Sequence, residues 1–281
     1  LTYGVIMTIL CVGIPMQVFP YIWILLSMFK ANKEVRAIPP TFFPNKWLWE
    51  NIPQTFAKYH LEQNILNSLL LCVGVILIQV TISTLAAYAL SKLKPKGSKW
   101  VMTFFLGTMM INSQALAWPT YIMFTNFFGV RMIDNLWSLI LSFSAWAWAI
   151  FILKSFFDSL PQDLLESARI DGANRWQTLW RVTIPNVMPS ITICMFLSLT
   201  NGFKLFDQNL ALTGGRPFLQ QADGSVVKTT EMLALNIYNS FYSGSGNNRG
   251  VAQAKAVLFF ILVAAIGLIQ LRATRKKEVQ Q

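Results

Sequence analysis

Six long stretches without a charged residue or a histidine constrain this chain more than any other feature. They cover residues 1–29, 63–91, 100–130, 135–153, 182–203 and 256–271. A helix needs about 20 mainly apolar residues to cross a bilayer, and it satisfies its own backbone polar groups there. The last stretch is shorter and must take in residues 251–254 and Lys255 to span. The sequence therefore predicts an all-α integral membrane protein with six transmembrane helices.

The expected spans form one transmembrane domain over residues 1–281. Their approximate limits are 4–29, 65–91, 101–128, 135–154, 184–206 and 251–271. We expect the third span to be a broken helix, because Pro119 and the polar triplet at 112–114 interrupt an overlong apolar run.

Basic residues flank two of the predicted spans and indicate the orientation of the chain. One cluster comprises Lys92, Lys94, Lys96 and Lys99, and the other comprises Arg272, Arg275, Lys276 and Lys277. Basic loops of membrane proteins tend to stay in the cytoplasm. Both clusters are therefore predicted to be cytoplasmic, and parity over six spans places the loops at 30–62 and 204–250 outside.

The remaining polar residues argue against several function classes. The net charge is +11, yet no soluble stretch interleaves basic with aromatic residues, so we expect no nucleic-acid partner. The three cysteines lie inside apolar stretches and His60 is the only histidine, so neither a catalytic group nor a metal site is predicted. The sequence has no glycine-rich phosphate loop with Lys and Ser or Thr, so ATP is expected to bind another subunit.

A polar segment over residues 158–185 separates the fourth and fifth predicted spans. Pro161 suits the first turn of a helix, and Gly172 suits the left-handed residue that ends one. Asn174 can cap a second short helix, which Pro185 ends. The segment is too polar to cross a bilayer, although it lies between two segments that can. Its pattern predicts a helix–Gly–helix elbow that docks a partner protein.

The elbow carries the residues of a known loop: Glu166-Ser167-Ala168, Gly172 and Ile184-Pro185. These resemble the EAA loop of bacterial ABC importer permeases, with Ser167 where that family usually has alanine. The longer stretch ESARIDGANRWQTLWRVTIP is similar to the carbohydrate-uptake branch, the maltose-type sugar permeases. Residues 67–97 and 203–217 resemble the same branch. The resemblance implies a six-helix permease of the bacterial cytoplasmic (inner) membrane, in which the elbow is a cytoplasmic coupling loop.

The resemblance also implies partners and a mechanism. Such a permease pairs with a second homologous permease, two ATPase subunits that bind ATP and Mg, and an extracytoplasmic solute-binding protein. This chain would hold no cofactor, would contact membrane lipid, and would translocate a sugar or oligosaccharide by alternating access. Two alternatives stay open: the same permease fold importing a non-sugar solute, and a six-span membrane enzyme. The enzyme would need an intramembrane acid, base or nucleophile set, and the spans offer only scattered Ser, Thr and Cys.

The candidate ATPase-coupling residues all lie on the elbow: Leu164, Leu165, Glu166, Ala168, Asp171 and Gly172. Leu164, Leu165 and Ala168 form an apolar stripe that is expected to enter a groove of the ATPase. Glu166 offers a carboxylate to basic residues of the elbow or of that partner. The Asp171-Gly172 pair is expected to break the helix, because glycine adopts the left-handed conformation without strain.

The candidate residues of the translocation path are polar positions in or next to the spans: Asn112, Gln114, Asn201, Lys204 and Asp207. Unpaired polar groups are costly inside a membrane. Asn112 and Gln114 therefore either hydrogen bond to neighbouring helices or line the path and meet sugar hydroxyls. Lys204 and Asp207 are three residues apart and are expected to pair on one helix face rather than to contact substrate. The tryptophans are expected at the membrane interfaces rather than against the sugar.

Overall fold

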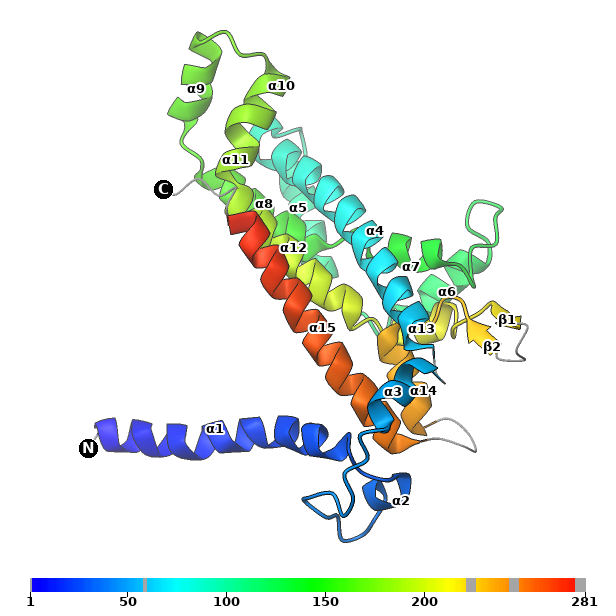
Figure 1. Cartoon of the computed structure of the whole chain (residues 1–281). Helices are drawn as coiled ribbons and strands as arrows, with labels where there is room; N and C mark the ends of the chain where they lie inside the picture. Colours follow the sequence, from blue (N-terminus) through cyan, green and yellow to red (C-terminus); the bar gives the residue numbers. More distant parts are fainter. Residues whose placement is uncertain (1, 58–59, 221–225, 243–247, 276–281) are drawn as a thin grey trace. The chain divides into compact units, whose positions relative to one another are not determined.

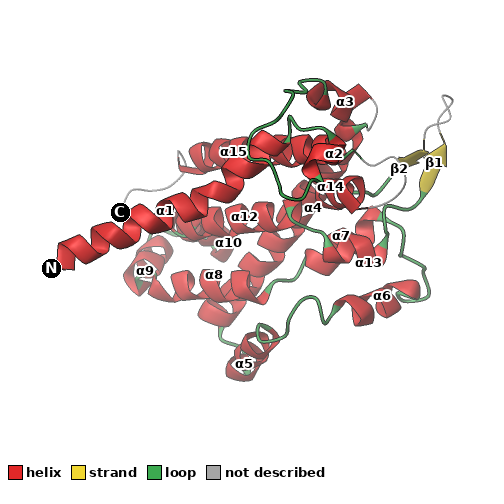
Figure 2. Cartoon of the chain, turned by 90° about the horizontal axis from the view of Figure 1, so that it is seen from below, coloured by secondary structure: helices red, strands yellow, loops and turns green. Residues whose placement is uncertain are grey.

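The computed structural model describes residues 2–57, 60–220, 226–242 and 248–275. The described chain is mainly helical, with one two-stranded sheet and several connecting loops (Figures 1 and 2). Its contacts group into two compact units. One unit comprises Leu1–Ile65 and Leu233–Leu262, and the other comprises Leu66–Met232 and Val263–Gln281. The long helices α4 (Leu61–Tyr88) and α15 (Arg249–Arg275) therefore belong partly to each unit.

The first unit contains the start of α4, the first part of α15, α1 (Thr2–Ser27), α2 (Asn32–Val35), α3 (Asn51–Ala57) and α14 (Leu233–Tyr242). Polar side chains join the ends of these helices. The Asn51 side chain donates to the carbonyl oxygens of Met28 (2.8 Å) and Lys30 (3.2 Å), which fastens α3 to the end of α1. The buried Lys255 ammonium donates to Asn236 Oδ1 (2.7 Å), so α15 is tied to α14. A buried charge needs such hydrogen-bond partners to offset its loss of hydration.

The second unit continues α4 into a five-residue π-helix, η1 (Ala89–Leu93). Its other elements are α5 (Ser98–Thr108), α6 (Ala117–Thr125), α7 (Leu136–Phe143), α8 (Ala147–Ser159), α9 (Gln162–Ile170), α10 (Arg175–Thr178), the π-helix η2 (Leu179–Thr183), α11 (Ile184–Asn186), α12 (Met188–Phe203), α13 (Asp207–Leu212), β1 (Phe218–Gln220) and β2 (Val226–Lys228). The two strands pair antiparallel, with Phe218 opposite Lys228. No strand was expected, because three residues are too few to show an alternating pattern.

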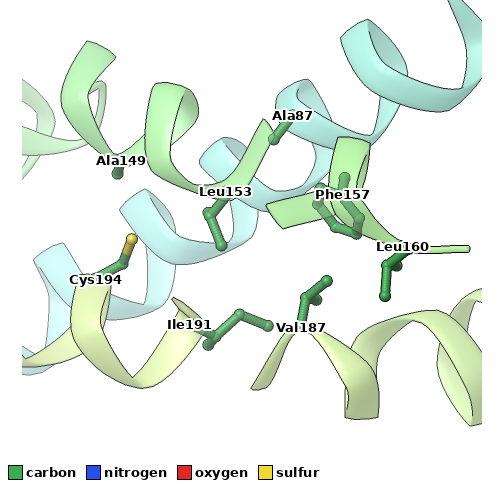
Figure 3. Close-up of a cluster of buried hydrophobic side chains, with 8 residues drawn as sticks. All are labelled: Ala87, Ala149, Leu153, Phe157, Leu160, Val187, Ile191 and Cys194. Carbon is green, nitrogen blue, oxygen red and sulfur yellow. The ribbon is translucent and has the colours of Figure 1, made fainter. Parts of the chain in front are cut away.

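The core of the second unit is an apolar cluster formed by α4, α8 and the α11–α12 segment (Figure 3). Its buried members are Ala87, Ala149, Leu153, Phe157, Leu160, Val187, Ile191 and Cys194. Close packing holds membrane helices together, because lipid tails are as apolar as the side chains themselves. Gly202 of α12 permits a close approach to α4, since a Cβ there would lie 2.9 Å from Cys72 Sγ. The cluster thus brings the end of α8 against the end of α4.

The predicted all-α membrane fold is confirmed, although fewer helices are uninterrupted than expected. Three described helices are long and apolar enough to cross a membrane: Leu10–Ser27, Leu61–Leu93 and Arg249–Ala273. Two further candidates are bent pairs, Leu136–Phe143 with Ala147–Ser159 at 41° and Arg175–Asn186 with Met188–Phe203 at 70°. If each bent pair is one span, the described residues contain five candidate spans by length and composition.

The third predicted span is two short helices rather than one membrane-crossing helix. α5 has 11 residues and α6 has 9, and residues 109–116 separate them. In that interval Asn112 Oδ1 accepts a hydrogen bond from the backbone N–H of Gln114 (3.0 Å), an arrangement that turns the chain. Pro119 lies in the first turn of α6, where its missing N–H removes no intrahelical hydrogen bond. The expected break is present, but it spans a whole turn region and leaves neither helix long enough to cross.

Candidate functional site

A cavity of about 740 Å³ lies within the second unit. Its walls come from α4, α5, α6, α7, α8, α12 and α13 and from the turns that join them. Its polar lining includes Gln79, Ser142, Ser198, Asn201, Lys204 and Asp207. Pockets of ~300–1,000 Å³ with a few placed polar groups are typical sites for small ligands. The cavity is therefore large enough for a small polar solute.

The cavity includes three of the five candidate path residues. Asn201, Lys204 and Asp207 line it, whereas Asn112 and Gln114 do not. Both of the latter side chains are exposed, and the side-chain oxygen Oδ1 of Asn112 accepts a hydrogen bond from the backbone N–H of Gln114. The neighbouring Ser113 does border the cavity. The turn at 109–116 thus contributes to the wall through Ser113 instead of through the two amides.

Lys204 and Asp207 do not share a helix face, contrary to the favoured expectation. α12 ends at Phe203 with Lys204 as its C-cap, and α13 starts at Asp207. Because the chain turns between them, the spacing of three residues does not place the two side chains on one face of a helix. The salt bridges found among the described residues do not include this pair. Both charged side chains instead border the cavity.

Several cavity residues were not predicted. Gln79 of α4 and Ser198 of α12 are buried and line the cavity. A polar residue within an apolar stretch was the signal that singled out Asn112, and the same signal points to Gln79. Trp146 and Trp148 also line the cavity, although the tryptophans were expected at the membrane interfaces. Two indole side chains therefore form part of the cavity wall.

The elbow begins with α9, which ends at a left-handed turn. The backbone N–H of Gly172 donates to the carbonyl of Arg169, and that of Ala173 donates to the carbonyl of Ala168, both at 3.0 Å. This hydrogen-bond pair is the Schellman motif, which requires a residue with positive φ after the helix. Gly172 supplies it with φ of 81°. No atom lies within 4 Å of where its Cβ would be, so backbone conformation and not space calls for glycine.

The second half of the elbow is α10, followed directly by η2 and α11 (Figure 1). The Asn174 side chain accepts from the backbone N–H of Gln177 (2.8 Å), and the Gln177 side chain accepts from the backbone N–H of Asn174 (2.9 Å). This capping box satisfies two backbone donors at the start of the helix. The predicted helix–Gly–helix arrangement is therefore present, with Gly172 and Asn174 in their expected roles, but Pro185 does not end the second helix, which continues to Asn186.

The predicted coupling residues divide into an exposed and a buried set. Leu164 is 40% exposed, and Glu166, Asp171 and Gly172 are exposed too. Leu165 is partly buried, and Ala168 is only 7% exposed because it packs inside the elbow. Glu166 Oε1 accepts a hydrogen bond from Gln162 Nε2 (3.0 Å) on the same helix.

The exposed apolar surface of the elbow includes residues outside the predicted stripe. Ile170 is 86% exposed, and Trp176 is 65% exposed. Large apolar side chains on a polar segment typically mark a surface that another protein covers. Ile170 and Leu164 therefore form the apolar part of α9 that is available to a partner, whereas Ala168 is not.

The fold and the site together define a class: an integral membrane protein with a cavity among its helices and an exposed helix–Gly–helix elbow between two of them. The chain belongs to the family described as binding-protein-dependent transport system inner membrane component, whose model matches residues 79–277. Members of this family are transport subunits of the inner membrane, so the alternative of a six-span membrane enzyme is excluded.

Individual relatives agree with this assignment. The chain is 38% identical over 156 residues to the probable starch degradation products transport system permease protein AmyD of Thermoanaerobacterium thermosulfurigenes, a match that covers 56% of this chain and 47% of the relative. It is 35% identical over 133 residues to the multiple sugar-binding transport system permease protein MsmF of Streptococcus mutans, covering 47% and 42%. The matches thus span about half the length of these relatives.

A solved structure shows the same fold. A chain from the crystal structure of a bacterial ABC transporter involved in the import of the acidic polysaccharide alginate matches with a TM-score of 0.77. The match covers 96% of both chains at 18% sequence identity. The two chains therefore share one fold over nearly their whole length.

Proposed function

We propose that this chain is the permease subunit of an ATP-driven importer for a sugar or oligosaccharide that a solute-binding protein delivers. The observation that carries the proposal is a cavity combining amide, hydroxyl and indole groups in the same unit as the elbow. The sugar-transport names of two relatives support the solute class. A second homologous permease and two ATPase subunits would complete the complex.

The chemistry of the cavity suits a neutral, polyhydroxylated solute. Gln79 and Asn201 can each donate and accept hydrogen bonds, as sugar hydroxyls do. Indole faces match the apolar face of a sugar ring. Lys204 and Asp207 contribute one charge of each sign, so the lining does not favour one sign of solute charge.

The elbow connects this cavity to ATP hydrolysis by the partner subunits. In the proposed arrangement Leu164 and Ile170 of α9 enter a groove of the ATPase, a helix-in-groove contact. Closure of the ATPase dimer on ATP moves the elbow and reverses the side on which the cavity is open. Shifting such an equilibrium from 1:99 to 99:1 requires about 5.5 kcal/mol of differential binding, to which ATP and the loaded solute-binding protein both contribute.

Uptake into proteoliposomes tests the solute class. The complete transporter is reconstituted with its solute-binding protein, and labelled oligosaccharides, amino acids and inorganic anions are offered in turn. We expect ATP-dependent, saturable uptake of an oligosaccharide or simple sugar. Uptake of an amino acid or an inorganic anion, with none of any sugar, would instead identify a permease of the same fold for another solute.

Replacement of Asn201 with leucine is expected to reduce uptake about tenfold, the effect of losing roughly 1.4 kcal/mol of solute interaction. An apolar wall cannot replace hydrogen bonds to solute hydroxyls. Gln114→Leu is the matched control, because Gln114 lies outside the cavity lining. Initial uptake rates at equal amounts of assembled complex provide the measurement. Equal losses in the two variants would show that the cavity is not the solute path.

Labelling of single cysteines tests the orientation of the chain. In a background without native cysteines, Asn45→Cys is expected to react with an impermeant maleimide in intact spheroplasts, because parity places 30–62 outside. Lys96→Cys is expected to react only after permeabilisation, as are cysteines on the elbow. In the basic tail, Lys276 and Lys277 lie outside the described residues. Reaction of position 45 only after permeabilisation would invert the topology.

A further inference from the structure

A carboxylate at the end of α8 joins two helices that are far apart in the sequence. Asp158 Oδ1 accepts a hydrogen bond from Ser91 Oγ of η1 at 2.5 Å. Its other oxygen, Oδ2, pairs with Lys154 Nζ on the same helix, also at 2.5 Å. The two contacts differ in what they connect, because the first runs from α8 to the end of α4 and the second stays within α8.

The next residue of η1 makes a second connection to the same place. Lys92 Nζ donates to the carbonyl oxygen of Leu160 at 3.5 Å. Leu160 is buried in the apolar cluster of α4, α8 and α12, and Pro161 directly follows it as the N-cap of α9. Two consecutive residues of η1 therefore contact Asp158 and Leu160, just before α9, the first helix of the elbow.

The helix that carries η1 also forms a wall of the cavity. α4 runs without interruption from Leu61 to Tyr88 and passes directly into η1. Gln79 and Val75 of α4 line the cavity about three and about four turns before η1, at 3.6 residues per turn. A helix moves largely as one body over this length, so a displacement at η1 reaches the cavity wall.

We infer that Asp158 is a positioning residue that transmits movement of the elbow to α4 and hence to the cavity. The inference rests on the proposed function, since it concerns how that transport is coupled. η1 suits this role because single-turn π-helices disturb the regular backbone hydrogen bonds and are frequent at functional sites. The bonds Ser91–Asp158 and Lys92–Leu160 fasten this irregular turn to the start of the elbow.

The two contacts of this carboxylate differ in how far their partners are exposed to solvent. Ser91 is 1% exposed, so its hydroxyl loses solvation and depends on Asp158 as acceptor. The Lys154 and Asp158 side chains are 25% and 43% exposed, and solvent weakens an ion pair of that kind. Removing the Ser91 hydroxyl is therefore expected to separate α4 from α8, whereas removing the Lys154 ammonium is not.

The test measures how accessible the cavity is to a water-soluble reagent, so it requires no knowledge of the solute. The complete transporter carries Gln79→Cys as the only cysteine and is reconstituted in proteoliposomes. Labelling by a water-soluble maleimide is compared without nucleotide and after trapping with ATP and vanadate. ATP hydrolysis is measured on the same samples. We expect trapping to change the labelling rate several-fold in this background.

Four variants separate a transmitting contact from a stabilising one. Ser91→Ala and Asp158→Ala are expected to lose most of the nucleotide-dependent change in labelling while ATP hydrolysis continues. Asp158→Asn keeps an acceptor for Ser91 and is expected to restore most of the change. Lys154→Ala, the matched control, is expected to respond as the background does.

The outcomes distinguish this inference from the proposed function. If Ser91→Ala and Asp158→Ala respond to trapping as fully as the background, the contact does not transmit movement. Equal loss in Lys154→Ala would also overturn the inference, because the ion pair of Lys154 with Asp158 stays within α8. If the background shows no nucleotide-dependent labelling, the coupled transport proposed above fails and the inference fails with it.

Discussion

Replacement of Gly172 with valine is expected to abolish ATP-driven uptake while the chain still inserts into the membrane. Gly172 has φ of 81°, a conformation that a β-branched residue adopts only with strain. Strain of about 1–3 kcal/mol would lower the population of the native elbow by roughly 5- to 150-fold. The Schellman turn that ends α9 would open, and α9 and α10 would no longer keep one arrangement relative to each other.

The measurement is uptake together with receptor-stimulated ATP hydrolysis, and both are expected to fall. Binding of solute by the separate receptor is expected to be unchanged. Gly129→Val is the matched control, since Gly129 has φ of 86° and equally open surroundings but lies between α6 and α7. Normal transport by Gly172→Val in a fully assembled complex would show that the elbow does not couple the subunits.

Replacement of Leu164 with aspartate is expected to release the ATPase subunits. Leu164 is the exposed member of the predicted apolar stripe, and full burial of a leucine contributes about 1.5–3 kcal/mol. The variant loses this burial free energy and must also bury an unpaired carboxylate at the interface, which costs more than the lost burial. The affinity for the ATPase is therefore expected to fall at least about 100-fold. Co-purification of the ATPase with the permease measures the effect.

A second leucine provides the control for this substitution. Leu219 of β1 is 58% exposed and lies outside the elbow, so Leu219→Asp is expected to retain the ATPase. Ala168→Asp is a less informative variant, because Ala168 is buried within the elbow and the new charge would disrupt α9 itself. Retention of the ATPase by Leu164→Asp would place the docking surface elsewhere on the elbow.

Features that depend on neighbours along the chain could be predicted from the sequence. Charge-free stretches of helical length indicated the apolar helices, because a helix in lipid satisfies its backbone locally. The elbow followed from Pro161, Gly172 and Asn174, each of which acts on backbone groups only a few residues away. These signals gave the correct helical class and the helix–Gly–helix arrangement of the elbow, and the resemblance of the same segment led to the correct family.

The cavity could not be predicted in the same way, because residues far apart in the sequence form it. Gln79 and Asn112 present the same pattern, an amide in an apolar stretch, yet Gln79 borders the cavity and Asn112 closes a turn. Spacing suggested that Lys204 and Asp207 share a helix face, but the chain turns between α12 and α13. Helical periodicity describes positions within one continuous helix. The packing of α4, α8 and α12 against one another sets which side chains meet across them.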